Sequence, residues 1–237
     1  MRLLRQLAWV AALALALSAC ATQSYYTAET LRRDGDGHAP RILMMPPDVE
    51  LYEFDATGNL DVNALWTRDA ASHLASGTRA HLEDMHIRFA SFSPPAEDSP
   101  EAMRLDQVQK LHGAVGTTIR TYHFNQNNRL PAKNGQFDWS LGSEAQALGE
   151  HAEADYALFL WVRDSYSTPG RVALRMVAAL AGVSVGGGMQ LGHASLVDLK
   201  TGQVVWFNAL HARQDGDLRD AAKARETVAL LLDKLPK

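Results

Sequence analysis

Asp155-Tyr156-Ala157-Leu158-Phe159-Leu160-Trp161-Val162 is apolar at every position after its first residue. A strand with one solvated face alternates apolar and polar residues, whereas a strand covered on both faces is a continuous apolar run. The stretch therefore predicts the central strand of a covered sheet, with residues 157–162 in the core. Helices packed on a sheet in this way are typical of an α/β domain.

A hairpin follows the central strand in the sequence. Two apolar segments, 196–199 and 203–207, flank Lys200-Thr201-Gly202, and a glycine readily adopts the positive φ of a tight hairpin turn. Trp206 lies in the second segment. Because both segments read as strands of the same covered sheet, we expect Trp206 in the core.

The strands and helices around this centre follow from periodicity and from residues that favour helix ends. Pro46-Pro47 interrupts an opening strand, and Ser99-Pro100 combines a helix-capping serine with a proline at the first helical position. Strands are predicted over 41–45, 49–54 and 87–92, and helices from 61 onward, from 100 to about 123, over 143–154 and over 218–235. The fold class predicted is α/β, a single mixed-sheet domain with flanking helices.

The N-terminus resembles a bacterial lipoprotein signal. Arg2 and Arg5 precede an apolar core too short to span a bilayer, and Leu17-Ser18-Ala19-Cys20 closes it. The resemblance implies that residues 1–19 are removed and that Cys20 carries the acyl chains. Ala21, in place of aspartate, implies transfer to the outer membrane, with the body facing the periplasm. An ordinary signal peptide with an unmodified Cys20 is the alternative.

Residues 20–39 are polar, contain Asp34-Gly35-Asp36-Gly37, and are interpreted as a flexible tether to a periplasmic domain over 40–237. Loss of Arg2 and Arg5 reduces 23 basic residues to 21 against 27 acidic ones, a formal charge of −6. This charge argues against a nucleic-acid partner. Cys20 is the only cysteine, which leaves no intrachain disulfide and no cysteine metal site.

Two short patterns carry a resemblance to a family. Residues 154–159 (ADYALF) and 197–206 (VDLKTGQVVW) are similar to segments of CsgG, LpoB and the Pel-export lipoproteins and their relatives. The resemblance covers most of the chain after Ala39. It implies an α/β domain like the N-terminal domain of TolB, and it indicates fold better than function.

The sequence contains no complete set of residues that would indicate an enzyme. His73, His81 and His86 do not share a helix face, and their spacing is not that of a zinc site. Ser91, Ser93 and Ser184 have no neighbouring base. Residues 182–186 (GVSVG) match the Gly-x-Ser-x-Gly spacing, but they follow the helix-like residues 172–180 rather than a strand. The other histidines, His112, His123, His151, His193 and His211, are scattered. We predict no catalytic residue, metal ligand or cofactor, while sites built from sequence-distant residues stay open.

An apolar, glycine-rich insertion over 172–192 separates the central strand from the hairpin, and Arg175 is its one charged residue. In the CsgG family the related insertions are the membrane-spanning hairpins of a ring-shaped channel. Here residues 172–180 are helix-like instead. Three interpretations stay open, with the first favoured: a helix and loop packed on the domain, a contact for a partner or membrane, and a pore strand pair. The candidate contact residues are Val172, Leu174, Val177, Leu180, Val183, Met189 and Leu191.

The sequence thus predicts an outer-membrane-anchored lipoprotein that is a non-enzymatic accessory or assembly component of a cell-envelope complex. Its expected partners are the membrane, through the N-terminal acyl chains, and envelope proteins or further copies of the chain. A secretion-channel subunit like CsgG is the first alternative. An envelope hydrolase is the second.

Overall fold

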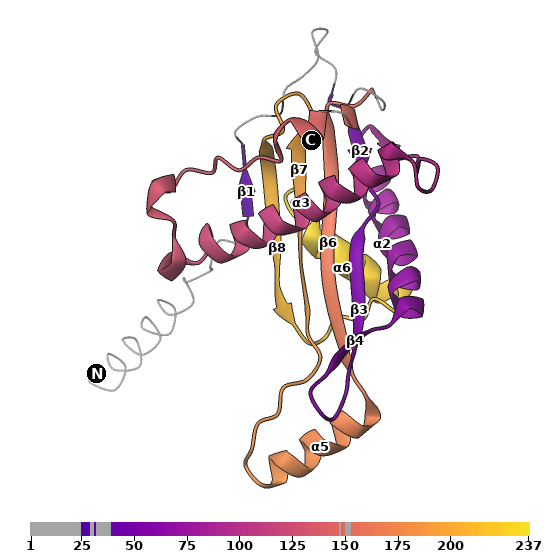
Figure 1. Ribbon diagram of the computed structural model, residues 1–237, viewed down its shortest axis with the longest axis vertical. Coiled ribbons are helices and arrows are strands. Elements are labelled where there is room, and N and C mark those ends of the chain that lie inside the picture. Colours follow the sequence, from indigo (N-terminus) through magenta and orange to yellow (C-terminus); the bar gives the residue numbers. More distant parts are fainter. Residues whose placement is uncertain (1–24, 29–30, 32–38, 147, 150–152) are drawn as a thin grey trace, which may run out of the picture.

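The computed structural model describes residues 25–28, 31, 39–146, 148–149 and 153–237. These residues form one open mixed sheet with helices on both faces (Figure 1). The strands are β1 Tyr25–Thr27, β2 Ile42–Met44, β3 Asp48–Phe54, β4 Leu60–Val62, β5 Phe89–Ser91, β6 Tyr156–Ser167, β7 Gln190–Asp198 and β8 Val204–Arg213. The α-helices are α2 Ala64–Asp84, α3 Pro100–Tyr122, α5 Pro169–Leu180 and α6 Ala221–Leu231, and 3-10 turns cover Gln126–Asn128, Pro131–Lys133 and Gly142–Ala145. The α/β mixed-sheet fold class is confirmed.

β6 is the central strand, as the apolar run predicts. The sheet order is β1-β8-β7-β6-β2-β5, and β3 also pairs with β6. β7 lies antiparallel to β6, while β2 and β3 lie parallel to it along its other edge. The break at Pro46-Pro47 divides that edge, because β2 pairs with 156–158 and β3 with 161–167. Of residues 157–162, all but the half-buried Trp161 are buried.

The core has two layers, one on each face of the sheet. Helices α2 and α6 cover the layer that contains Leu74, Leu231 and Trp206. Helix α3 covers the layer that contains Phe159 and Phe207. Trp206 is fully buried, which confirms its predicted place in the core. The hairpin between β7 and β8 is also confirmed, and its Gly202 has φ +74°.

The helix ends are partly as predicted. The Ser99 hydroxyl accepts a hydrogen bond from the Ala102 amide at 3.1 Å and caps α3. Helix α2 begins at Ala64 rather than at Asp61, because residues 60–62 form β4 beside β3. The helix predicted over 143–154 begins as a 3-10 turn, and residues 147 and 150–152 lie outside the described residues. The closing helix α6 is shorter than its apolar pattern.

Three residues of the segment expected to be a tether are in the sheet. Tyr25–Thr27 form β1, which pairs antiparallel with β8. A three-residue strand has too few positions to show an alternating pattern, and pairing satisfies backbone groups along the open edge of β8. The signal region and Cys20 lie outside the described residues.

Among the helices that the structure describes, none combines the length and the apolar character needed to cross a membrane.

Candidate functional site

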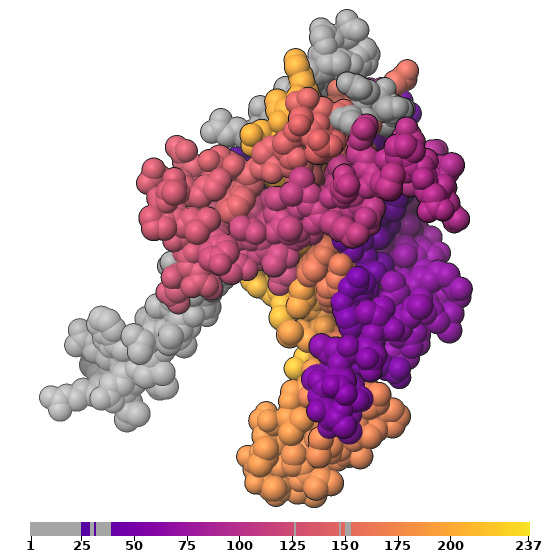
Figure 2. Space-filling view, in the orientation of Figure 1, coloured from indigo at the N-terminus to yellow at the C-terminus, as the bar shows by residue number. Residues whose placement is uncertain are grey.

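The insertion forms a separate lobe at one end of the sheet. We define the tip as residues 169–189, which comprise α5 and the chain that returns from it to β7. The tip leaves the sheet where β6 ends and rejoins it where β7 begins. Figures 1 and 2 show it in orange, projecting beyond the strands.

The apolar side chains of the tip face outward. Leu180 is 91% exposed, Val177 66% and Met176 65%. The other exposed members are Val172, Leu174, Val183 and Met189. The favoured expectation, a helix packed on the domain, is therefore wrong, and the chain over 169–189 contains no strand. A contiguous exposed apolar surface of this kind is typical of an interaction site.

Both arginines of the tip turn back toward the return chain. Arg171 is buried, donates to the carbonyl oxygens of Gly186 and Asp55 at 3.0 Å each, and stacks on the Phe54 ring at 3.3 Å. Arg175 Nε donates to the Val185 carbonyl at 3.1 Å. Residues 172–174 and 176–189 have no ionisable side chain, so the outward surface is uncharged.

The base of the tip is fixed by close backbone contacts to β6. The Ser165 hydroxyl accepts a hydrogen bond from the Met189 amide at 2.9 Å, and the Ser167 hydroxyl accepts one from the Gly188 amide at 3.2 Å. A Cβ at Gly188 would lie 1.9 Å from the Ser165 carbonyl oxygen, so only glycine fits there. The tip is therefore held at both ends by the sheet.

Sequence reasoning missed part of this surface, and one of its candidate contact residues lies outside the tip. Met176 belongs to the exposed face, and Leu60 and Val62 of β4 are further exposed apolar residues, at 52% and 55%. The β3–β4 turn approaches the start of the tip, because the Cβ of Ala56 lies 3.8 Å from the position that a Cβ on Gly170 would occupy. Leu191, in contrast, is a partly buried residue of β7 opposite Arg163. The apolar run over 172–180 is the sequence signal that could have identified Met176 as a member of this surface.

Two of the scattered histidines meet beneath α3. His112 of α3 and His193 of β7 have ring centroids 5.1 Å apart, and His112 Nε2 lies 2.7 Å from the Ser195 hydroxyl. Neither ring nitrogen of His193 forms a hydrogen bond of ordinary geometry within the described part of the chain. All three residues are at most 2% exposed, so a substrate could reach them only if α3 moved away. This cluster is a packing feature rather than a reaction site.

Burial keeps both imidazoles neutral. It lowers the pKa of His112 to about 3. Burial, the neighbouring His112 and the charges of Arg120 and Arg163 lower the pKa of His193 well below its usual range. In the unfolded chain a histidine takes up a proton near pH 6.5. Between the folded and unfolded pKa values the unfolded state binds more protons, so stability falls as the pH falls below about 6.5.

We therefore expect acid to destabilise the fold through these histidines. At pH 5, each contributes a loss of about 2 kcal/mol relative to pH 7. Thermal unfolding of the wild type and of His112→Gln at pH 7.5 and pH 5.0 measures this, and the variant should lose less stability on acidification. An equal loss in both proteins would show that His112 does not drive the acid response.

A second polar cluster surrounds a buried carboxylate at the base of the tip. Asp164 accepts hydrogen bonds from the Tyr166 hydroxyl at 2.6 Å and from the Gln190 amide at 2.7 Å. Burial raises the pKa of Asp164. Asp217 pairs with Arg219 beside this cluster. A polar cavity of about 230 Å³ borders this cluster. Asp164 lines the cavity together with three cationic residues, Arg175, Arg213 and Arg219.

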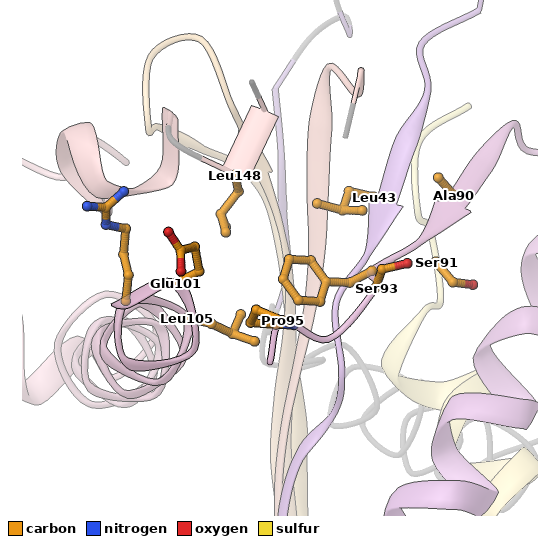
Figure 3. Close-up of a pocket in the computed structure, with 10 residues that line it drawn as sticks. Leu43, Ala90, Ser91, Ser93, Pro95, Glu101, Leu105 and Leu148 are labelled. Carbon is orange, nitrogen blue, oxygen red and sulfur yellow. The ribbon is translucent and has the colours of Figure 1, made fainter. Parts of the chain in front are cut away.

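An apolar cavity of about 300 Å³ lies between β5 and α3 (Figure 3). Leu43, Leu105 and Leu148 converge on it from β2, α3 and the chain after the Gly142–Ala145 turn. Ser91 and Ser93 also line it, together with the charged residues Glu101 and Arg104, and its lining within the described residues includes no histidine. The Ser91 hydroxyl accepts a hydrogen bond from the Arg79 guanidinium at 2.8 Å.

No group of three or more histidine, cysteine, aspartate or glutamate side chains among the described residues has the geometry to hold a metal ion. His73 contacts the Leu218 carbonyl oxygen at 3.0 Å, and His86 lies just beyond the end of α2.

Comparison with known proteins gives weak structural likenesses. No family model matches the chain, and no curated protein matches it. The PelC dodecamer from Paraburkholderia phytofirmans is 14% identical, with a TM-score of 0.38 over 90% of this chain and 97% of that one. Lipoprotein GNA1162 from Neisseria meningitidis is 13% identical, with a TM-score of 0.32 over 83% and 97%. The LpoB C-terminal domain from Salmonella enterica is 13% identical, with a TM-score of 0.28 over 77% and 88%. Scores of this size carry no inference about function.

Proposed function

We propose that this chain is an outer-membrane-anchored lipoprotein that faces the periplasm and serves as a non-enzymatic accessory or assembly component of a cell-envelope complex. Cys20, at the end of the lipoprotein signal, is the proposed acylation site. The tip is the proposed contact surface. The observation that carries the proposal is the uncharged, outward-facing apolar surface of α5. Exposure of such a surface to water is unfavourable, so we infer that another component of the envelope covers it.

The polar clusters support a binding role over a catalytic one. The His112–Ser195 pair is enclosed beneath α3, and the Asp164 carboxylate is occupied by two hydrogen bonds. The described lining of the apolar cavity offers its serines the carboxylate of Glu101 but no histidine, and the Ser91 hydroxyl already bonds to Arg79. A secretion-channel subunit would need paired strands from the insertion, whereas residues 169–180 form a helix.

Polar substitution of the tip should abolish assembly without unfolding the domain. In the variant Met176→Gln, Val177→Gln, Leu180→Gln, the outward apolar surface is lost while helix propensity is kept, since these side chains make few contacts in the core. We expect the variant to stay in washed outer membranes but to run as a smaller species than the wild type on native gels of mild-detergent extracts.

The matched control replaces three exposed apolar residues elsewhere, Met103, Leu111 and Leu230, by glutamine. This control should keep the size of the wild-type complex. A tip variant that assembles as the wild type does would exclude the tip as the contact surface. A tip variant lost from the membrane would exclude Cys20 as a sufficient anchor.

A further inference from the structure

β1 fixes the direction from which the N-terminal chain reaches the sheet. Tyr25 lies opposite Asn208, and Thr27 lies opposite Trp206. β8 runs on from Asn208 to Arg213, which lies opposite Gln190, where the tip rejoins the sheet. An extension of β1 before Tyr25 therefore points toward the end of the sheet that carries the tip.

The pairing of β1 also shortens the link to Cys20. Only four residues lie between Cys20 and Tyr25, and the five residue-to-residue steps of an extended chain cover at most about 17 Å. The distance along β8 from Asn208 to Arg213 is about the same, at roughly 3.3 Å per residue. A bilayer that holds acyl chains on Cys20 therefore lies close to the sheet, within reach of its tip-bearing end.

The chemistry of the tip fits a bilayer surface. A helix of 12 residues is too short to span a hydrocarbon core but suits a position in the interface, where it buries one apolar face. Its exposed residues are aliphatic or small, and both of its arginines bond to backbone carbonyl oxygens on the inner side. Nothing charged would have to lose its water if the outward surface of α5 entered lipid.

We propose that the tip inserts into the interfacial region of the same bilayer that holds the acyl chains of Cys20. The domain then contacts the membrane at two points, which sets the orientation of the sheet relative to the bilayer, and assembly into the envelope complex depends on that orientation. This inference rests on the proposed function, because it takes Cys20 to be acylated.

A fluorescent probe on the tip tests the inference with the full acylated chain. Cys20 is the only native cysteine, so Leu180→Cys adds a single free thiol for a nitrobenzoxadiazole label once Cys20 is acylated. Leu230→Cys on α6, where the native side chain is 47% exposed, is the matched control. Both proteins are reconstituted into phosphatidylethanolamine–phosphatidylglycerol vesicles with and without nitroxide-labelled lipid.

We expect the probe at 180 to shift to shorter emission wavelength and to be quenched several-fold by the nitroxide lipid, while the probe at 230 keeps its emission in water. Emission at 180 that matches the water-exposed control would overturn the inference. Shielding at 180 without quenching, together with a doubled particle mass, would also overturn it and would identify a second copy as the cover.

The failure of the anchor is distinguishable from the failure of the tip. Wild-type chain that takes up the label, or whose intact mass lacks acyl chains, has a free Cys20 and contradicts the proposed anchor. In that case the variant Cys20→Ser, Leu180→Cys carries the label at 180 alone, and added to vesicles from solution it still reports whether the tip enters lipid.

Discussion

Gly116→Val should prevent α3 from packing on the sheet and leave most of the chain unfolded at room temperature. A Cβ at Gly116 would lie 2.0 Å from Nε2 of His193. The His193 ring has little room to retreat, because it stacks against Trp161 at 5.0 Å and Phe207 at 5.4 Å. Overpacking costs about 1–3 kcal/mol where the core can adjust, and we expect more here.

Circular dichroism and urea unfolding measure this effect, with Ala114→Val on the exposed face of α3 as the control for valine in a helix. The control should unfold close to the wild type. Gly116→Ala combined with His193→Ala should be less destabilised than the sum of the two single changes, since the second removes the ring that the first strikes. A Gly116→Val protein as stable as the control would show that α3 does not lie this close to β7.

Trp206→Ala should cost about 3–5 kcal/mol, a large part of the 5–15 kcal/mol by which most domains are stable. The side chain is fully buried beneath α2 and α6 and leaves a cavity that β7 and β8 are too constrained to fill.

Trp206→Phe is the matched control. The indole N–H of Trp206 has no hydrogen-bond partner among the described residues, so phenylalanine loses volume but no hydrogen bond. Its loss of stability in urea should be well below that of the alanine variant. Equal midpoints for wild type and Trp206→Ala would remove Trp206 from the core.

The elements that the sequence predicts well are those whose signal is local. The apolar run of β6 indicates a strand that is covered on both faces. Ser99-Pro100 predicts the exact residue at which α3 begins. β1 has no such signal, because three residues hold no period and their partner is the open edge of β8. The contact of His112 with His193 was equally hidden, since it depends on how α3 crosses the sheet.

The tip shows a different limit. Apolar residues predict burial, but a sequence does not say whether the cover is the same chain, another chain or lipid. The structure places Leu180 and Val177 in the open and turns Arg171 inward, which no periodicity argument distinguishes from a packed helix. The interaction surface therefore emerges only when the three-dimensional fold is combined with the apolar pattern.

The central claim is that the tip is covered in the cell envelope, and thiol protection in intact envelopes tests it most directly. Leu180→Cys and Leu230→Cys chains, with Cys20 acylated, are treated with a bulky maleimide before and after solubilisation in detergent. The account predicts that the cysteine at 180 reacts many-fold more slowly than that at 230 in the envelope, and at a similar rate after solubilisation. Equal rates at 180 and 230 in the intact envelope would contradict it.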